Sequence, residues 1–359
     1  MKSKSLFIIT ISIVLFFSCF NKSTVKEVSL KGHVIKTDLN DGVWAKWMFD
    51  DIIYAMDHNF SVFCGKLTRF RWEKTEKALV CGEGENEFGY ITLSQDNDRA
   101  LYVLNHSLQR EKLISLTKIC RTDNNATFKA PEKWEKYDLG QLPNFLQLGD
   151  TFVVLSDSSI LVTGAPADDM RHVLSVINFK NQTIVPLDYW PNDGTPENRI
   201  EEKWSVYNSG CGINSNGKDK FLYWDDSGKF AFIFTIDGKK INIQNYLYAD
   251  HLPIPNIEKT PSTERIYCIS DNDRIYLLHK NLNSKGQKMK SFNIKDPFQM
   301  GNTVEVYDWN GAKQHIIHLD KCGRMIMLSQ NSKTLYLYSD YMIDRYDTYI
   351  YAYDLGSLK

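Results

Sequence analysis

The stretch Ser270–Leu278, which reads SDNDRIYLL, joins a polar turn to a strand rich in branched and aromatic residues. Closely similar phrases occur at Ser94–Leu104 (SQDNDRALYVL) and at Ser329–Tyr338 (SQNSKTLYLY). Looser versions occur at three further places: residues 57–63, 156–162 and 216–224. The six turns divide the chain into units of about 57 residues, with a shorter first interval. A repeat that fills nearly the whole chain indicates one repetitive all-β domain.

Each unit also holds a second phrase, in which an apolar strand leads through a short polar turn into another strand. These phrases lie at residues 70–75, 103–107, 176–181, 232–239, 304–311 and 350–355. Two hairpins per unit give about four antiparallel strands, and six such sheets around an axis form a six-bladed β-propeller. The last unit lacks an outer strand, so we predict that the N-terminal run Val28–Ile35 supplies it and closes the ring. Two β-sandwiches would also space strands in this way, but the constant repeat favours the propeller.

The composition agrees with a folded, strand-rich protein. Of the 359 residues, 43% are hydrophobic and 13% are aromatic, which excludes general disorder. The 43 Lys and Arg residues balance 44 Asp and Glu residues without forming a basic stripe, so we expect no nucleic-acid partner. The sequence motifs typical of serine hydrolases, zinc proteases and P-loop proteins are absent.

The N-terminus predicts a bacterial lipoprotein signal. Lys2 and Lys4 precede the apolar run Leu6–Phe17, which is too short to cross a bilayer as a helix. The small residue Ser18 directly before Cys19 resembles a lipobox, in which the cysteine is lipidated and becomes the mature N-terminus. The alternative is an ordinary signal peptide with an incidental cysteine. We therefore expect a signal peptide over residues 1–18, a lipidated tether over 19–27 and a single propeller domain over 28–359.

No metal site or cofactor is expected. His315 and His318 are close in sequence, but residues three apart on a strand point to opposite faces. The Asp-Asn-Asp phrases at 96–98 and 271–273 lack the Gly and Glu of an EF-hand loop, so we expect them to bond the turn backbone. Of the six cysteines other than Cys19, Cys64 and Cys81 could face one another across a hairpin. We favour small buried cysteine side chains over disulfides.

The candidate binding residues lie on loops. Trp190, Asn192 and Asp193 belong to the best exposed-loop candidate, and the Pro-rich stretch Leu252–Asn256 is comparable. Several tryptophans could form a platform for carbohydrate, but packing between blades is the simpler interpretation. These tryptophans are Trp44, Trp47, Trp134, Trp190, Trp204 and Trp224. Ile213, Ile269 and Met327 are expected on inner strands, either lining the channel or packing between blades.

The closing repeats carry a family resemblance. The segment Asn302–Gly311, the pair Leu319–Asp320 and the strand Thr334–Tyr338 resemble the last repeats of the TolB-like six-bladed propeller lipoproteins of Bacteroides-type bacteria. Gly82–Phe88 is similar to the Gly-x-Gly-Pro-Gly-Glu-Phe segment of that family, with Glu and Asn in place of Pro and Gly. The resemblance covers residues 28–355, and it implies a fold and an envelope location without assigning an activity.

We predict a lipid-anchored, non-enzymatic binding module with a protein or glycan partner in the cell envelope. The residues just past Cys19, Phe20–Val25, carry no acidic cluster of the kind usual in surface-exposed lipoproteins, which favours the periplasmic face of the outer membrane. The alternative is a propeller enzyme, a hydrolase or lyase, with an active site at the channel mouth. An enzyme should show carboxylates, His or Arg converging there with shifted pKa values, and a binding module should show an aromatic or apolar patch.

Overall fold

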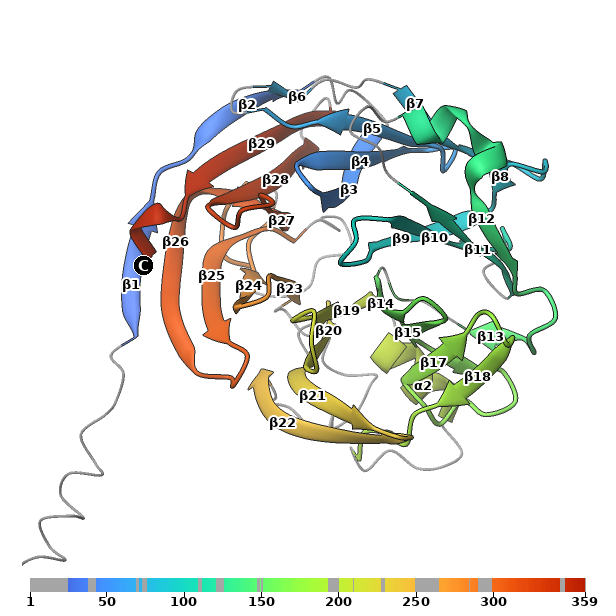
Figure 1. Cartoon of the computed structure of the whole chain (residues 1–359). Coiled ribbons are helices and arrows are strands. Elements are labelled where there is room, and N and C mark those ends of the chain that lie inside the picture. Colours follow the sequence, from blue (N-terminus) through green and yellow to red (C-terminus); the bar gives the residue numbers. More distant parts are fainter. Residues whose placement is uncertain are drawn as a thin grey trace, which may run out of the picture.

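The six larger β-sheets are arranged in a ring around a common axis in the structure, a computed structural model (Figure 1). The structure describes residues 25–358 apart from 38–42, 69–70, 73–75, 109–111, 121–125, 147–148, 150, 193–199, 209, 227–229, 249–264, 284, 290–298 and 343–345. The predicted six-bladed β-propeller is confirmed. Its blades hold four or five strands each, so the prediction of about four strands per blade is also confirmed.

The first three blades follow one another along the chain. Blade 1 contains β3 (Val43–Phe49), β4 (Ile52–Asp57), β5 (Val62–Lys66), β7 (Glu76–Cys81) and β8 (Glu87–Phe88). Blade 2 contains β9 (Tyr90–Gln95), β10 (Leu101–His106), β11 (Leu113–Ile119) and β12 (Glu135–Asp138). Blade 3 contains β14 (Phe152–Ser156), β15 (Ser159–Thr163), β17 (Leu174–Asn178) and β18 (Thr183–Pro186). The short strands β13 (Phe145–Leu146) and β16 (Ala165–Pro166) pair with each other.

The last two blades use strands from the N-terminus. Blade 4 contains β19 (Cys211–Ser215), β20 (Phe221–Asp225), β21 (Ala231–Asp237) and β22 (Lys240–Tyr248). Blade 5 contains β23 (Arg265–Ser270), β24 (Arg274–Lys280), β25 (Gly301–Asp308), β26 (Lys313–Gly323) and β1 (Lys26–Leu30). Blade 6 contains β27 (Met325–Leu328), β28 (Thr334–Met342), β29 (Tyr346–Asp354), β2 (His33–Thr37) and β6 (Arg71–Trp72). Among the described residues there are also the helix α2 (Ile200–Asn208) and three 3₁₀ turns, Ala126–Lys129, Pro131–Lys133 and Gly356–Leu358.

The N-terminal run closes the ring, but only in its second half. β2 pairs antiparallel with β29, which places Ile35 opposite Ile350 as the missing outer strand of blade 6. The prediction is wrong for residues 28–30, because β1 lies parallel to β26 on the outer edge of blade 5. Gly32 stands between the two strands, where an added Cβ would come within 2.7 Å of the Tyr353 ring. The small residue therefore lets the chain cross from one blade to the next.

One turn was assigned to the wrong place in the repeat. The turn at residues 57–61 joins the second and third strands of blade 1, whereas the other five quoted turns join first and second strands. The equivalent turn in blade 1 is Asp50–Asp51, with φ angles of 52° and 60°. Two left-handed residues form a tight hairpin without any Gly or Asn, so this turn lacks the expected sequence signal. The expected hairpin at residues 70–75 is also wrong, because Arg71–Trp72 pairs parallel with β2.

The core lies between the blades. Among the described residues, six hydrophobic clusters each join two neighbouring blades around the ring. Trp47, Trp72, Trp224 and Trp309 are buried in them or against their strands, so packing between blades is the main role of these rings. Each sheet thus buries both faces, which is why its strands read as nearly continuous apolar runs.

Other expectations about polar residues hold. Asp96 Oδ1 accepts the Ala100 N–H at 2.8 Å, and Asp271 Oδ1 accepts the N–H groups of Asp273 and Arg274. His315 is buried and His318 is exposed on the same strand, as the strand period requires. All six described cysteines are free thiols: Cys64, Cys211 and Cys268 are buried, Cys81 and Cys322 are partly buried, and Cys120 is exposed. The described helices include none that is long and apolar enough to span a membrane.

Candidate functional site

The inner strands of all six blades run in the same direction along the channel, because each blade begins with its innermost strand. Their first residues therefore gather at one mouth and their first turns at the other. Two adjoining cavities fill the channel, one of 620 Å³ at the strand starts and one of 480 Å³ at the turns. We name them the channel pocket and the turn cavity. The side chains of Lys46, Trp47, Thr151 and Tyr267 line both.

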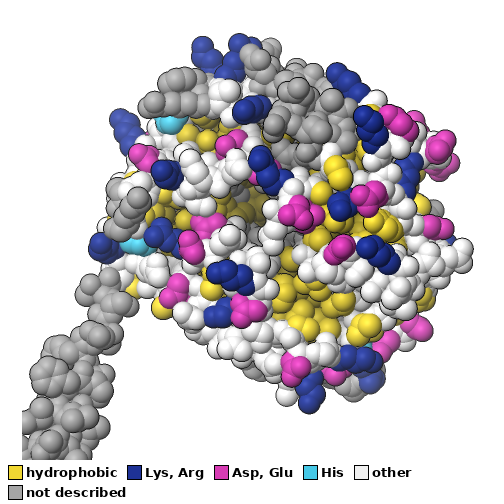
Figure 2. Space-filling model, in the orientation of Figure 1, with side chains coloured by type: hydrophobic (Ala, Val, Ile, Leu, Met, Phe, Trp, Pro, Cys, Tyr) yellow, Lys and Arg dark blue, Asp and Glu magenta, His cyan; other side chains and the backbone are white. Residues whose placement is uncertain are grey.

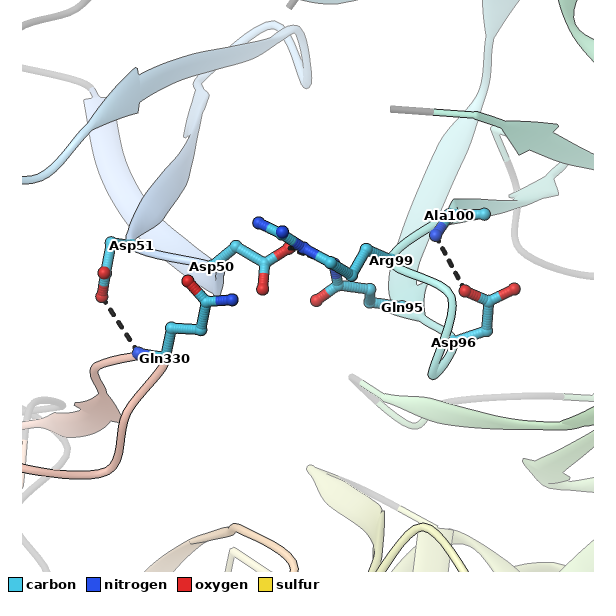
Figure 3. Close-up of polar contacts among 7 residues, drawn as sticks. All are labelled: Asp50, Asp51, Gln95, Asp96, Arg99, Ala100 and Gln330. Carbon is cyan, nitrogen blue, oxygen red and sulfur yellow. Dashed lines mark hydrogen bonds and ion pairs between the residues drawn. The ribbon is translucent and has the colours of Figure 1, made fainter. Parts of the chain in front are cut away.

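The turn cavity is surrounded by polar groups that bond to one another across blades (Figure 3). Asp50 of blade 1 accepts the Arg99 Nε–H at 2.9 Å and the Gln95 amide at 2.5 Å from blade 2. Asp51 accepts the backbone N–H of Gln330 in blade 6 at 3.0 Å. The hairpin of blade 1 thus ties together both of its neighbours at the junction where the ring closes. These contacts give the turn cavity a structural role.

The turn mouth is also narrow. A Cβ placed on Gly217 of blade 4 would lie 3.2 Å from Asn272 Oδ1 and 3.4 Å from Asn97 Oδ1. The turn tips of blades 2, 4 and 5 therefore approach one another here. Ile213, Ile269 and Met327 line the turn cavity and also belong to, or pack against, the clusters between blades, so both expected positions apply to them. The wider channel pocket is consequently the better candidate for a ligand site.

Aromatic rings form much of the wall of the channel pocket. They are Trp44, Trp47, Phe60, Tyr90, Trp224, Tyr267 and Tyr338. Trp224 and Tyr267 meet edge to face with ring centroids 5.1 Å apart, and the indole N–H of Trp224 donates to Asn214 Oδ1. Lys46 Nζ stands about 5 Å from the rings of both Trp47 and Tyr90. Some tryptophans thus pack between blades and also face the channel.

Phe60 sits at this pocket in an unusual backbone conformation. Its φ angle is 61°, in the left-handed region that costs a non-glycine residue roughly 1–2 kcal/mol. Asp57 holds the turn, because its carboxylate accepts the N–H groups of Asn59 and Ser61 at 2.9 Å. The Phe60 ring is 38% exposed and meets Tyr90 edge to face at 5.9 Å. A strained, half-exposed ring beside a cavity is a feature that structural packing does not require.

Charged side chains from blades 4, 5 and 6 converge on the opposite part of the wall. Lys280 ends β24, and its Nζ lies 3.1 Å from Asp226 Oδ1. Arg265 stands opposite Lys280 across β23 and β24, and its Nη1 is 3.8 Å from Asp226 Oδ2. The Asp226 carbonyl accepts the N–H of Ile266, which fixes blade 4 against blade 5. One carboxylate is thus shared by two cations.

A second ion pair follows in blade 6. Arg324 precedes β27 and donates through Nη1 to Asp340 Oδ2 at 3.0 Å. Asp340 Oδ1 is buried and has no hydrogen-bond partner in another described residue. Burial raises the pKa of Asp340, although Arg324 opposes that shift. The pocket therefore presents an unused acceptor beside a cation.

Lys280 is only 6% exposed. Burial lowers the pKa of Lys280, because an ammonium group loses its hydration there, and the nearby charge of Asp226 works in the opposite direction. An ammonium has three N–H donors, so Lys280 can bond Asp226 and still donate to a ligand. The described residues contain no group of three or more His, Cys, Asp or Glu side chains suited to a metal.

The predicted loop residues lie elsewhere. Trp190 is partly buried against the cluster between blades 3 and 4, and Lys203 of α2 places its Nζ 4.9 Å from that ring. Asn192 is exposed. Neither residue lines the channel pocket. Asp193, the stretch Leu252–Asn256 and Cys19 lie outside the described residues.

Sequence reasoning missed Lys280, Arg324 and Asp340. A signal was present, because blades 5 and 6 each place an Arg at the start of the inner strand and a charged residue at the end of the second strand. Aligning the last two units on their first turns would have matched Arg265 with Arg324 and Lys280 with Asp340. The pairing of these ends across a hairpin then brings the charges to one mouth.

Charged side chains of both signs are mixed over the face of the ring seen in Figure 2, so this face carries no single-sign patch.

No protein-family profile and no curated protein sequence matches the chain. A solved structure of a "putative exported protein" from Bacteroides fragilis superimposes with a TM-score of 0.50 at 10% identity, over 91% of this chain and 99% of that one. The β-propeller domain of Cps50 (Swd1) from Myceliophteria thermophila gives a TM-score of 0.45 at 9% identity, over 90% of this chain and 100% of that one. The likeness to the Bacteroides fragilis protein supports the propeller fold alone.

Proposed function

We propose that this protein is a lipid-anchored binding module of the bacterial cell envelope, and that its channel pocket binds a saccharide. The observation that carries the proposal is a 620 Å³ cavity that combines seven aromatic side chains with buried charged groups. Flat aromatic faces pack against the C–H faces of sugar rings, while charged groups bond their hydroxyls. A cavity of this size is typical of small-molecule sites.

The envelope location is proposed from the sequence. The lipobox-like Ser18–Cys19 pair and the resemblance to TolB-like propeller lipoproteins support a lipid anchor, and the absence of an acidic cluster over Phe20–Val25 favours the periplasmic face of the outer membrane. Trp190, Asn192 and Asp193 remain a proposed second contact surface, for a protein or glycan partner.

The anchor is tested by labelling the full chain with a palmitate analogue in bacterial cells. We expect label on the natural protein and none on Cys19→Ala, whereas Cys120→Ala, which removes an exposed cysteine, should keep the label. Equal labelling of the two variants would contradict the lipoprotein proposal.

The pocket is tested with the Phe60→Gly variant on an array of soluble oligosaccharides. Glycine accepts the left-handed conformation, so we expect the free energy of unfolding to change by less than about 1 kcal/mol. The affinity for a bound oligosaccharide should fall at least about fivefold, because a stacking ring is lost. Leu108→Gly removes an exposed side chain that does not line the pocket and should leave affinity unchanged. Natural protein that binds neither neutral nor acidic oligosaccharides would contradict the proposal.

An enzyme is the second candidate, and one observation favours it. Asp226, Lys280, Arg324 and Asp340 converge in one pocket, and burial shifts the pKa of Lys280 down and that of Asp340 up. Such paired shifts are typical of acid–base sites. Incubation of the natural protein with each bound oligosaccharide, followed by mass analysis, distinguishes the two. Cleavage that is lost in Asp340→Asn would assign a hydrolase or lyase.

A further inference from the structure

We propose that the sugar bound in the channel pocket is acidic, with its carboxylate placed between Lys280 and Arg324 and a hydroxyl donating to Asp340. This inference rests on the proposed saccharide site and names the class of its ligand. It is argued from the charges, the buried acceptor and the aromatic wall together.

The charges of the pocket do not balance. Among the described lining residues, Lys46, Lys280 and Arg324 are cationic, whereas Asp226 and Asp340 are anionic. Asp226 is further shared with Arg265, which leaves Lys280 less than fully compensated. A buried cation is stabilised by an opposite charge at hydrogen-bond distance. An added carboxylate between Lys280 and Arg324 would offset part of this positive charge.

The buried acceptor requires a donor. Asp340 is 8% exposed, and the free oxygen Oδ1 has no partner in another described residue. A buried polar atom without a partner is unfavourable, and a ligand hydroxyl that donates to it would remove this cost. Arg324 bonds the other oxygen of the same carboxylate, so the acceptor lies next to a cation. A ligand must therefore offer a donor and an anionic group close together.

The aromatic wall decides the kind of molecule that carries these groups. Tyr267 lies beside Lys280, whose Nζ is 5.8 Å from the ring centroid. Tyr338 lies two residues before Asp340 on strand β28. The side chains of Tyr338 and Tyr267 line the same pocket as Asp340. A uronic acid unit has a carboxylate and hydroxyls on its edge and C–H groups on its faces. These features match a wall in which rings stand beside a cation and an acceptor.

The test uses trimers of galacturonate, glucuronate and mannuronate together with their methyl esters, titrated into the full chain and followed by tryptophan fluorescence. Each ester keeps the sugar and removes only the charge. We expect at least one acid to bind roughly tenfold more tightly than its ester, with a preference that weakens at high salt. Arg324→Gln should abolish this preference, and because Arg324 is 42% exposed the variant should fold. Lys280→Arg should retain the preference, and Lys218→Met, which changes the turn cavity, should leave it unchanged.

The outcomes separate this inference from the proposed function. Esters that bind as tightly as the acids would overturn the acidic ligand and keep a saccharide site. Failure of both the acids and the neutral oligosaccharides of the array to bind would overturn both. A peptide whose binding depends on its free C-terminal carboxylate and on Arg324 would replace the sugar with a peptide ligand and would also overturn the inference.

Discussion

Replacing Ile35 by Asp is expected to lower the free energy of unfolding by at least about 4 kcal/mol, enough to leave much of the protein unfolded. Ile35 is 1% exposed and lies in the cluster between blades 6 and 1. Its strand β2 is the antiparallel neighbour of β29 at the point where the ring closes. A buried carboxylate there would remove apolar contacts and would have no cation to pair with in that cluster.

The neighbouring residue supplies the matched control. Val34 on the same strand is 52% exposed and points to the opposite face, so Val34→Asp should change stability by less than about 0.5 kcal/mol. Urea denaturation followed by tryptophan fluorescence measures both variants. Similar losses in the two would mean that β2 does not close the ring in this register.

The second large effect is expected for Glu305→Gln, which should lower the free energy of unfolding by about 3 kcal/mol at pH 7. The Glu305 side chain is 15% exposed within blade 5. Its Oε1 accepts from Lys313 Nζ at 2.5 Å, and its Oε2 accepts from the Tyr307 hydroxyl and lies 3.3 Å from His279 Nε2. Burial alone would raise the pKa of Glu305, but the bonds from His279, Lys313 and Tyr307 outweigh it and lower that pKa to about 2.

The sign of the pH dependence follows from this shift. Because the pKa of Glu305 in the folded protein lies below its ordinary value of 4.5, the charged Glu305 stabilises the protein fully above about pH 4.5. That stability is lost as the pH falls through 4.5 towards 2. The difference in free energy of unfolding between the natural protein and Glu305→Gln should therefore shrink to about 1.5 kcal/mol at pH 3.

Urea denaturation at pH 7 and pH 3 checks the expected gap. Among the described residues, the titratable side chains that contact Glu305 are His279, Tyr307 and Lys313, and Tyr248 of blade 4 packs edge to face on the His279 ring. Glu135→Gln is the control, because Glu135 is half exposed and its contact with Lys118 is 4.0 Å long. The free energy of unfolding of that variant should differ from that of the natural protein by less than about 0.5 kcal/mol at either pH. A gap for Glu305→Gln that stays constant with pH would contradict the predicted shift.

The repeat could be recognised in the sequence because the side chains that stabilise its turns bond to the backbone of the same turn. Asp96 and Asp271 bond the backbone N–H groups of their own turns, so the same short phrases recur wherever the same turn occurs. The Asp50–Asp51 turn was missed because its left-handed residues hold contacts to other blades, from Arg99 and Gln330. The crossing at Gly32 was missed for a similar reason, since the constraint comes from Tyr353 in the last blade.

In the candidate site, too, the residue types could be predicted from the sequence, whereas their arrangement depends on contacts between blades. The sequence indicated aromatic residues such as Trp44 and Trp224 but could not separate those buried between blades from those that also face the channel. Lys280 and Arg324 gave no linear motif, because they come from different blades and meet only when the ring forms.

By itself the sequence determined the all-β class, the number of blades and the approximate number of strands in each blade, because these follow from hydrophobic alternation and turn residues within each unit. Only the tertiary structure decided which blade each half of the N-terminal run joins and which charged side chains share the channel pocket. Those features depend on contacts between residues more than fifty positions apart, such as Asp226 with Lys280 and Ile35 with Ile350. Local propensity does not encode such distances, and the closed ring of blades sets them.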